Sequence, residues 1–494
     1  MRPPRQWSHL RRLPPAELKR LQDAALARYV REELYPFSAY YRRVFDEARV
    51  APRDIRGVAD LRRLPFTTKK DLLAAQVDPK RRTDFILVPT PGAIKQHWPF
   101  ERKLGVALGG DRARAALRRA YTPNFLTFTT GRSSDPVSFT YTPHDLEVLG
   151  EGIARMFDLL GVTGLDERVA NLFPFAPHLA FWALTLGGFT SGRMVVPSGG
   201  GKVMGTDGNL RLVARLKPTA IVGTPGFVYH LIRTGVEQKV DFSSVRTVVL
   251  GAEKTTPGLK LKMRGYLEQG GAREVRILGT YGFTEARMAF GEAPTADGAS
   301  SGYYFYPDLG VFEVVDPASG EPVPEGADGE LVYTGISGHG TVVLRYRTGD
   351  LVSGGVSWQP YPGVDCTLPR ISSSIRRVSE QHALSLTKLK GTLVDLAVMG
   401  QVIGEDRDVE EWQVVISKLN DDPYGLDQLE VRIAPRLGCD VEALQRRLGS
   451  GLASATEVTP NMISLHSVPE MLTLLGMESQ AKESRFLDKR PKPE

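Results

Sequence analysis

The sequence predicts an α/β protein: a large N-terminal domain with mainly parallel sheets and a β-rich section, followed by a small mobile α+β domain. Changes in the pattern of apolar, glycine and proline residues along the 494 residues indicate this division. From about residue 165, short apolar runs alternate with helix-like segments, which is typical of a largely parallel sheet covered by helices. After Gly302, strand-like runs separated by Gly and Pro indicate the β-rich section.

Helical periodicity dominates the first part of the chain. Residues 14–48 place Leu18, Leu21 and Ala25 on one helical face, and Thr67 precedes another helix start. We expect residues 1–35 to form a basic helical arm. Farther along, segments with the composition of buried strands occupy residues 168–175, 192–198, 218–225, 245–253 and 274–282.

The predicted domain boundary lies at residue 370. Residues 1–370 would form the N-terminal domain, and residues 371–494 would form the small C-terminal domain, which alternates strand-like and helix-like segments. Residues 368–377 contain consecutive serines, and small polar residues of this kind favour a hinge.

Composition excludes several classes of protein. The formal net charge of +6 is a mild excess that suits anionic substrates. The arginines near the N-terminus have two interpretations, a solvated basic arm or a patch for nucleic acid or an anionic membrane, and the first is favoured because no aromatic-rich basic stripe accompanies them. No apolar run approaches the roughly 20 residues of a spanning helix, and no secretory signal is evident. Cys366 and Cys439 are the only cysteines, so we expect no zinc site, no disulfide framework and a reducing cytoplasm.

A run of small hydroxyl-bearing residues around one glycine indicates a phosphate-binding loop. Backbone N–H groups, hydroxyls and a guanidinium in such a loop bind phosphate oxygens, although an ordinary surface turn has the same composition. The loop comprises Thr129, Thr130, Gly131, Arg132, Ser133 and Ser134.

Three further motifs follow apolar runs. Gly251, Ala252 and Glu253 end one such run, where ligands gather in parallel sheets; a plain strand-to-loop turn is the alternative. In a second motif, Tyr281 offers a stacking face, Thr284 a hydroxyl for phosphate and Glu285 a hard oxygen ligand for Mg²⁺. The alternative is that these are ordinary surface residues without a ligand. In the third, Asp350 follows a Thr-Gly pair, so its carboxylate is placed either to accept ribose hydroxyls or merely to sit in a turn before a strand.

These four motifs, in this order and ahead of a small C-terminal domain, resemble the adenylate-forming superfamily, and its phenylacetate–CoA ligase branch in particular. The sequences YGFTE and YRTGD are the most specific signals, and VDPASGEPVPEGADGELVYTG continues the resemblance. It spans about residue 36 to the C-terminus.

The resemblance implies a role for each matching position. It implies that Thr284 contacts the α-phosphate, that Glu285 holds Mg²⁺, and that Lys482 is the adenylation lysine. It places ATP on the Thr129–Ser134 loop and on Gly251, Ala252, Glu253, Thr280, Tyr281, Gly282, Asp350 and Arg370. It places the acid pocket at Phe175, His178, Phe181 and Gly279.

Some positions depart from the family pattern. Arg132 replaces a threonine, Ser134 the second glycine, and Asp135 the basic residue before Pro136. A carboxylate beside triphosphate repels it unless the carboxylate points away or Mg²⁺ intervenes. The hinge motif is also altered, so the adenylate-contacting role stays open among Arg370, Arg376 and Arg377.

The expected function is ATP-dependent activation of a carboxylic acid to acyl-adenylate, followed by transfer to a thiol, with coenzyme A as the expected acceptor. Transfer to a carrier protein, and a non-catalytic nucleotide- or acyl-binding relative, are the alternatives. Aromatic residues near Phe175 and Phe181 favour an aryl or other apolar acid, unless they serve only core packing. We expect small-molecule partners, no nucleic acid, and either a monomer or a homodimer.

Overall fold

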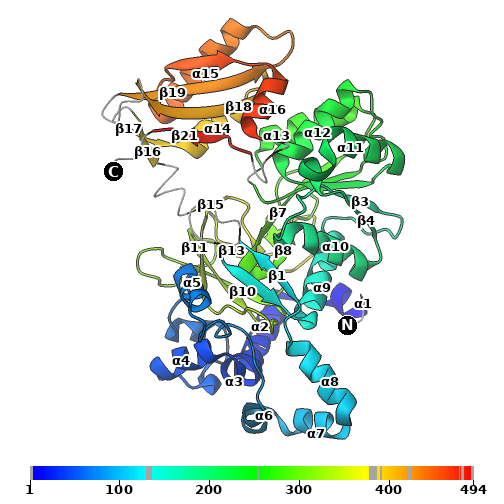
Figure 1. Cartoon of the computed structure of the whole chain (residues 1–494), viewed down its shortest axis with the longest axis vertical. Helices are drawn as coiled ribbons and strands as arrows, with labels where there is room; N and C mark the ends of the chain where they lie inside the picture. Colours follow the sequence, from blue (N-terminus) through cyan, green and yellow to red (C-terminus); the bar gives the residue numbers. More distant parts are fainter. Residues whose placement is uncertain are drawn as a thin grey trace. The chain divides into compact units, whose positions relative to one another are not determined.

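The computed structural model describes residues 4–129, 136–253, 255–377, 386–389, 392–419, 426–477, 479 and 483–490. The chain divides into two compact units (Figure 1). Unit 1 comprises residues 1–167, 176–195 and 278–376, and unit 2 comprises residues 168–175, 196–277 and 377–494. The C-terminal segment therefore groups with residues 196–277, while its boundary at residue 370 and its mobility stay predictions.

Unit 2 is built on a parallel sheet. The strands β3 (Arg168–Asn171), β5 (Ala220–Gly223) and β6 (Thr247–Leu250) pair in parallel in that order. Every residue of β5 and β6 is buried, as expected for parallel strands covered on both faces. Beside them in sheet order are β4 (Met194–Pro197) and β7 (Arg276–Phe283), and β8 (Met288–Gly291) pairs antiparallel with β7. The predicted mainly parallel sheet is confirmed.

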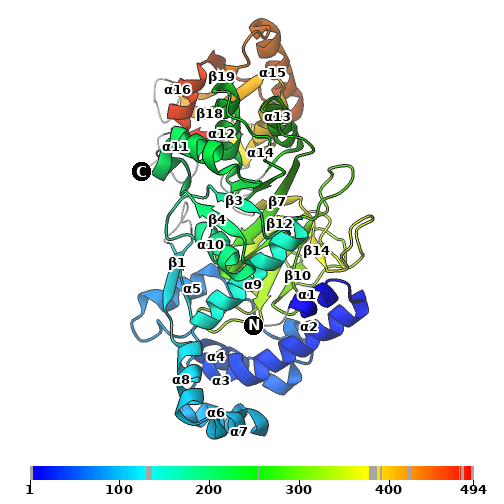
Figure 2. The same cartoon turned by 90° about the vertical axis from the view of Figure 1, so that its right-hand side faces the viewer.

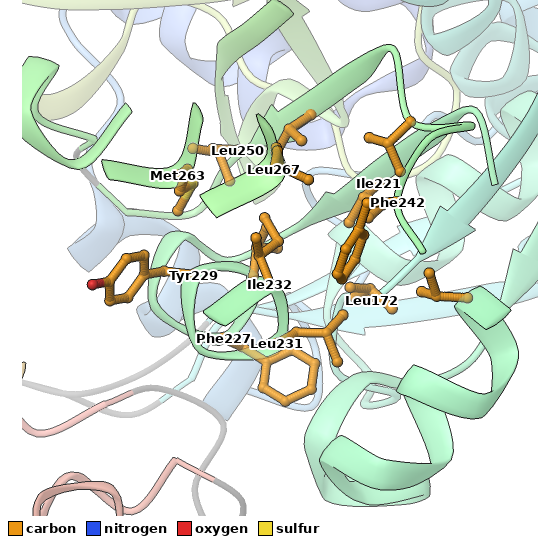
Figure 3. Packing of buried hydrophobic residues seen from close by; sticks show 14 of the residues in the cluster. Leu172, Ile221, Phe227, Tyr229, Leu231, Ile232, Phe242, Leu250, Met263 and Leu267 are labelled. Atoms are coloured by element: carbon orange, nitrogen blue, oxygen red, sulfur yellow. The ribbon is translucent and has the colours of Figure 1, made fainter. Parts of the chain in front are cut away.

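Helices follow the strands of unit 2 and bury its core. They are α11 (Gly200–Leu216), α12 (Pro225–Glu237) and α13 (Pro257–Gln269). Figure 3 shows Ile232 of α12 and Leu267 of α13 packed with Ile221, Phe242 and Leu250. The same core includes Ala434, Met471 and Leu475, so the C-terminal segment shares it.

The C-terminal segment has its own mixed sheet in the order β20-β19-β18-β21. A second core lies between this sheet and its helices, with Met399, Leu448 and Val431 fully buried or nearly so. The predicted alternation of strands and helices is therefore present. Its elements are β16 (Leu386–Leu389), β17 (Thr392–Asp395), α14 (Leu396–Glu405), β18 (Val409–Lys418), β19 (Asp427–Pro435), α15 (Val441–Thr456), β20 (Met462–Leu465), α16 (Val468–Leu475) and β21 (Phe486–Asp488).

Unit 1 begins with helices. The segment expected to form a basic arm is helical, but its apolar face is packed, since Leu18 and Leu26 are completely buried. The helices α6, α7 and α8 lie together at one end of the unit (Figure 2). The helices of unit 1 are α1 (Pro4–Leu10), α2 (Pro15–Tyr29), α3 (Tyr35–Phe37), α4 (Ala39–Glu47), α5 (Lys69–Val77), α6 (Pro91–His97), α7 (Phe100–Leu108), α8 (Gly110–Tyr121), α9 (Pro143–Leu159) and α10 (Leu179–Ser191).

The β-rich section of unit 1 follows Gly302 as predicted. It contains a sheet in the order β10-β11-β12-β15 and a small sheet in the order β13-β14-β9. A separate antiparallel hairpin joins β1 to β2. These strands are β1 (Phe125–Phe128), β2 (Ser138–Tyr141), β9 (Tyr303–Tyr304), β10 (Gly310–Val315), β11 (Gly329–Gly335), β12 (Tyr346–Val352), β13 (Val356–Ser357), β14 (Arg370–Ile371) and β15 (Ile375–Arg377). Within the described ranges, no helix has both the length and the apolar character needed to span a membrane.

A buried charge network ties the end of the chain to α12 within unit 2. Arg485 Nη2 lies 2.6 Å from Glu483 Oε2 and 3.0 Å from Glu411 Oε2, and Glu411 lies 3.7 Å from Arg233. The Glu483 carboxylate occupies the space beside Gly226, where a Cβ would lie 1.2 Å from Oε1. Burial raises the pKa of Glu483 to about 7, with Arg485 opposing the shift and the charges of Glu253 and Glu411 adding to it.

The core of unit 2 predicts that two leucine substitutions on one helix differ strongly in their effect on stability. Leu267 is fully buried and Leu261 is 64% exposed, and both lie on α13. Leu267→Ala should lower the free energy of unfolding by about 2–5 kcal/mol, because it leaves a cavity. Leu261→Ala should change it by less than about 0.5 kcal/mol. Chemical denaturation of both variants checks this, and equal losses would contradict it.

The position of Glu483 predicts a pH-dependent stability. Because the pKa of Glu483 is higher in the folded than in the unfolded chain, its protonated carboxyl stabilises the fold at low pH. This contribution of roughly 3 kcal/mol is lost as the pH rises from about 4.5 to about 7. Glu483→Gln should therefore leave the thermal midpoint nearly unchanged at pH 5 and raise it at pH 8. A variant that shifts the midpoint equally at both pH values would contradict this.

Candidate functional site

The expected phosphate loop falls in the sequence between β1 and β2, which pair as an antiparallel hairpin. Thr129 and Val137 close its base, since Thr129 N donates to Val137 O and Val137 N donates to Thr129 Oγ1, both at 2.9 Å. The Thr129 hydroxyl thus helps to hold the two strands together. Thr130, Gly131, Arg132, Ser133 and Ser134 lie outside the described residues, and their phosphate-binding role stays a prediction.

The base of this hairpin is tied to the start of α10 by two contacts. Phe128 N donates to Pro177 O at 2.8 Å, and His178 Nδ1 lies 3.1 Å from Phe128 O. His178 stands at the N-cap position of α10, although its side chain forms no capping hydrogen bond. The ring of His178 is therefore held against the end of β1.

The predicted acid-pocket residues are divided between the units. Phe181 is 6% exposed and meets Trp182 edge-on at 5.4 Å, so it takes part in the packing of unit 1 with His178 nearby in sequence. Phe175 belongs to unit 2 and is 55% exposed. Gly279, on β7 in unit 1, donates its N–H to Glu292 Oε2 at 2.6 Å. A Cβ at Gly279 would lie 3.2 Å from the Tyr303 hydroxyl, so a side chain there would crowd the ring.

Tyr281 and Asp350 meet although 69 positions separate them. The Tyr281 hydroxyl donates to Asp350 Oδ2 at 2.7 Å. The Tyr281 ring also stacks on Tyr303, with ring centroids 5.9 Å apart. Tyr281 lies within β7, between Thr280 and Gly282, and opposite Phe290 of β8. The strand expected over residues 274–282 is therefore present as β7, which continues to Phe283 and pairs with β8.

Asp350 is fixed by a bulge in β12. The ladder between β11 and β12 shifts between Glu330 and Val332, opposite the Thr348–Asp350 segment. Gly349 has φ +72°, a left-handed conformation that glycine adopts readily. Thr348 Oγ1 accepts a hydrogen bond from Asp350 N at 3.0 Å. The predicted Thr-Gly turn is thus a bulge within the strand, and it leaves the Asp350 residue 4% exposed.

Thr284 and Glu285 lie on the 3₁₀ turn η4 (Thr284–Ala286), which follows β7 directly. The Tyr346 hydroxyl donates to Glu285 Oε1 at 2.8 Å. Mg²⁺ usually binds through one or two carboxylates together with substrate phosphates. One carboxylate on the partly buried turn that follows β7 therefore fits a Mg²⁺ ion that arrives with a nucleotide.

Sequence reasoning missed Glu292, Tyr303 and Tyr346. Glu292 is 2% exposed, and it accepts hydrogen bonds from Gly279 N and the Ser300 hydroxyl. Burial, reinforced by the charge of Glu292, raises the pKa of Tyr303. Tyr346 lies inside the motif that carries Asp350 and could have been found there. Glu292 and Tyr303 carry no such local signal, because only folding brings them to β7.

The remaining nucleotide motif belongs to unit 2. Gly251, Ala252 and Glu253 follow β6 at the carboxyl end of the parallel strands, as expected. Gly251 N donates to Gly223 O at 3.1 Å, and Ala252 has φ +69°. Lys482 lies outside the described residues. Its neighbour Glu483 lies within the electrostatic influence of Glu253, so the end of the chain approaches this motif within unit 2.

Arg370 lies on β14, where its guanidinium stands over the Tyr361 ring at 5.1 Å. Its Nη2 also lies 3.4 Å from Gln359 O. Arg376 on β15 is exposed, and the side chain of Arg377 lies outside the described part. The choice among the three arginines stays open.

Comparison with known proteins gives a consistent relationship. A family model described as AMP-binding enzyme matches residues 148–343. A phenylacetate–coenzyme A ligase of Thermus thermophilus is 30% identical over 345 residues, which are 69% of this chain and 67% of the relative. A phenylacetate–coenzyme A ligase of Aromatoleum evansii is 27% identical over 347 residues, covering 68% and 66%.

Solved structures show the same fold. A 2-hydroxyisobutyryl-CoA ligase in the postadenylation state, in complex with 2-HIB-AMP, superposes with a TM-score of 0.73 at 20% identity, covering 98% of this chain and 92% of that chain. The family resemblance of the sequence motifs and the predicted fold class are confirmed. The chain therefore belongs to the phenylacetate–coenzyme A ligase family of AMP-binding, adenylate-forming enzymes.

Proposed function

We propose that this protein uses ATP to convert an aryl or other apolar carboxylic acid to its acyl-adenylate and passes the acyl group to the thiol of coenzyme A. The observation that carries the proposal is the grouping of two hydrogen-bonded pairs in unit 1, Tyr281 with Asp350 and Tyr346 with Glu285. Each pair joins the β7–η4 segment to β12. Membership in the ligase family supports the reaction class.

Adenylation would use these groups on ATP. A carboxylate oxygen of the acid attacks the α-phosphorus, the bond to the bridging oxygen breaks, and pyrophosphate leaves. The Tyr281 ring would lie against adenine, the Asp350 carboxylate would accept ribose hydroxyls, and Thr284 would donate to the α-phosphate. Glu285 would hold Mg²⁺, which neutralises phosphate charge when bound.

The second half-reaction transfers the acyl group. The sulfur of coenzyme A attacks the acyl carbon as a thiolate, and AMP leaves with the electron pair of the broken carbon–oxygen bond. Lys482 would act only in the first half-reaction, where its ammonium stabilises the charge that grows on the phosphoryl oxygens. We propose that residues 371–494 reorient between the two steps, so that one site serves both.

The aromatic residues support an apolar acid. Phe175 and Phe181 lie in the segment that resembles the family's acid-pocket region, and His178 is held beside the phosphate-loop hairpin.

Acid-dependent exchange of labelled pyrophosphate into ATP tests the proposal. In a panel of aryl, short aliphatic and polar acids, we expect exchange with at least one aryl or apolar acid, and formation of its coenzyme A thioester and AMP in a full assay. Exchange without thioester formation would indicate another acceptor, such as a carrier-protein thiol. An absence of exchange with every acid would refute the function.

Lys482→Ala provides the matched variant for the same assays. It should lose most exchange activity with little change in ATP affinity, because the lysine acts on the transition state. The variant should still transfer the acyl group from pre-formed acyl-adenylate to coenzyme A at nearly the wild-type rate. Equal losses in both steps would assign Lys482 a structural role.

Asp350→Ala should weaken ATP binding by about 1.5–3 kcal/mol, because it removes a charged hydrogen-bond acceptor. Tyr281→Phe, which removes only the hydroxyl that donates to Asp350, should have a smaller effect of about 0.5–1.5 kcal/mol. Asp328→Ala is the control, since this exposed carboxylate accepts only a hydrogen bond from Gly354 among its described contacts. Calorimetric titration measures all three, and an unchanged affinity in Asp350→Ala would remove this residue from the ribose site.

A further inference from the structure

A buried ion pair lies directly beyond the turn that carries Thr284 and Glu285. Arg287 Nη1 is 2.7 Å from Asp145 Oδ1, and the side chains are 10% and 2% exposed. The two residues are 142 positions apart in the sequence. Both lie in unit 1, so this contact is internal to one compact body.

The backbone of Arg287 closes the η4 turn in a conformation that is unusual for its residue type. Arg287 has φ +55°, and its N–H donates to Thr284 O at 3.1 Å. A side chain other than glycine in this left-handed region costs of order 1 kcal/mol, so the surroundings must hold it there. The ion pair is the contact of Arg287 that can do so, since it anchors the guanidinium two residues after Glu285.

Asp145 is a rigid anchor. Its Oδ2 accepts hydrogen bonds from Thr142 N at 2.8 Å, the Thr142 hydroxyl at 2.9 Å and Gly340 N at 2.7 Å, and its Oδ1 accepts one from His339 N at 2.9 Å. Burial alone would raise the pKa of Asp145, but the charge of Arg287 and the backbone donors hold it below its ordinary value. The carboxylate is therefore an anion, fixed in the first turn of α9.

The chain at Gly338 fits around the guanidinium. A Cβ on Gly338 would lie 1.6 Å from Arg287 Nη2, so a side chain cannot be added there while Arg287 keeps its place. The Tyr29 hydroxyl donates to Gly338 O at 2.7 Å and holds this segment from the other side. Arg287 thus connects the η4 turn to α9 and to the segment that includes residues 338–340.

We propose that the Arg287–Asp145 pair is a positioning device that sets the turn bearing Thr284 and Glu285 for the nucleotide and its Mg²⁺. This inference rests on the proposed function, in which those two residues contact the α-phosphate and the metal. Glu285 then has two restraints, the Tyr346 hydroxyl on its carboxylate and Arg287 on its backbone. Arg287 touches neither substrate nor metal and acts only through the turn.

The test compares Arg287→Met and Asp145→Asn with the wild-type protein. We expect the Mg²⁺ concentration for half-maximal pyrophosphate exchange to rise on the order of tenfold, as for other partners that orient metal-binding carboxylates. The maximal exchange rate should fall, while the KM for the acid stays near the wild-type value. Arg287→Lys keeps the charge, so the Mg²⁺ concentration for half-maximal exchange should lie between those of Arg287→Met and the wild-type protein. It also serves as the test variant if Arg287→Met does not fold.

Arg155→Met is the matched control, because it breaks a comparable buried pair on the same helix. Arg155 Nη1 lies 2.9 Å from Asp308 Oδ1, with side chains 3% and 1% exposed. This variant should lose stability but keep the wild-type Mg²⁺ dependence. An unchanged Mg²⁺ dependence in the Arg287 and Asp145 variants, or an equal shift in Arg155→Met, would overturn the positioning role.

The failure of the proposed function would be recognised separately. If the wild-type protein exchanges no pyrophosphate with any acid, the proposed function is refuted. In that case calorimetry on the same variants measures the Mg²⁺ dependence of ATP binding in place of the exchange assay. A shift in the Arg287 and Asp145 variants that Arg155→Met lacks would still support the positioning role, and its absence would refute it.

Discussion

The buried Asp145 carboxylate is the constraint on which the site in unit 1 depends. It accepts hydrogen bonds from Thr142, His339 and Gly340 and pairs with Arg287, so a single side chain joins α9, the β7–η4 segment and the chain after β11. A buried carboxylate stripped of any of these donors would be strongly unfavourable. The segments must therefore come together correctly or the fold loses stability, and the turn with Glu285 is placed as a consequence.

Around this anchor, the nucleotide-site candidates of unit 1 are joined by tyrosines. Tyr281 donates to Asp350 and Tyr346 donates to Glu285, so each phenol holds a carboxylate without neutralising it. A phenol forms one hydrogen bond to a carboxylate and leaves its negative charge in place, whereas an arginine can form two and pairs with the charge. Unit 2 uses charge differently. There Arg485 lies between Glu483 and Glu411, and this direct ion pairing offsets only part of the effect of burial on Glu483.

The relationship to phenylacetate–coenzyme A ligases explains why local sequence was so informative about the motifs. The order of the four motifs and the alternation of strands with helices predicted the fold and the family, and both were confirmed. Local patterns were less informative about boundaries. The strand expected over residues 274–282 begins at Arg276 and extends to Phe283, where β7 pairs with β8. Likewise, the Thr-Gly pair before Asp350 is a bulge, because β11 lies alongside it.

The sequence by itself determined the classes of element, the core-facing apolar runs and the identity of the candidate groups, since periodicity and motif spacing are local properties of the chain. Only the tertiary structure decided which groups meet. The Tyr281–Asp350 and Arg287–Asp145 contacts join residues 69 and 142 positions apart, and Glu292 reaches Gly279 through the β7–β8 pairing. Such contacts arise when packing brings distant strands and helices together, and no periodicity within one segment encodes its partner.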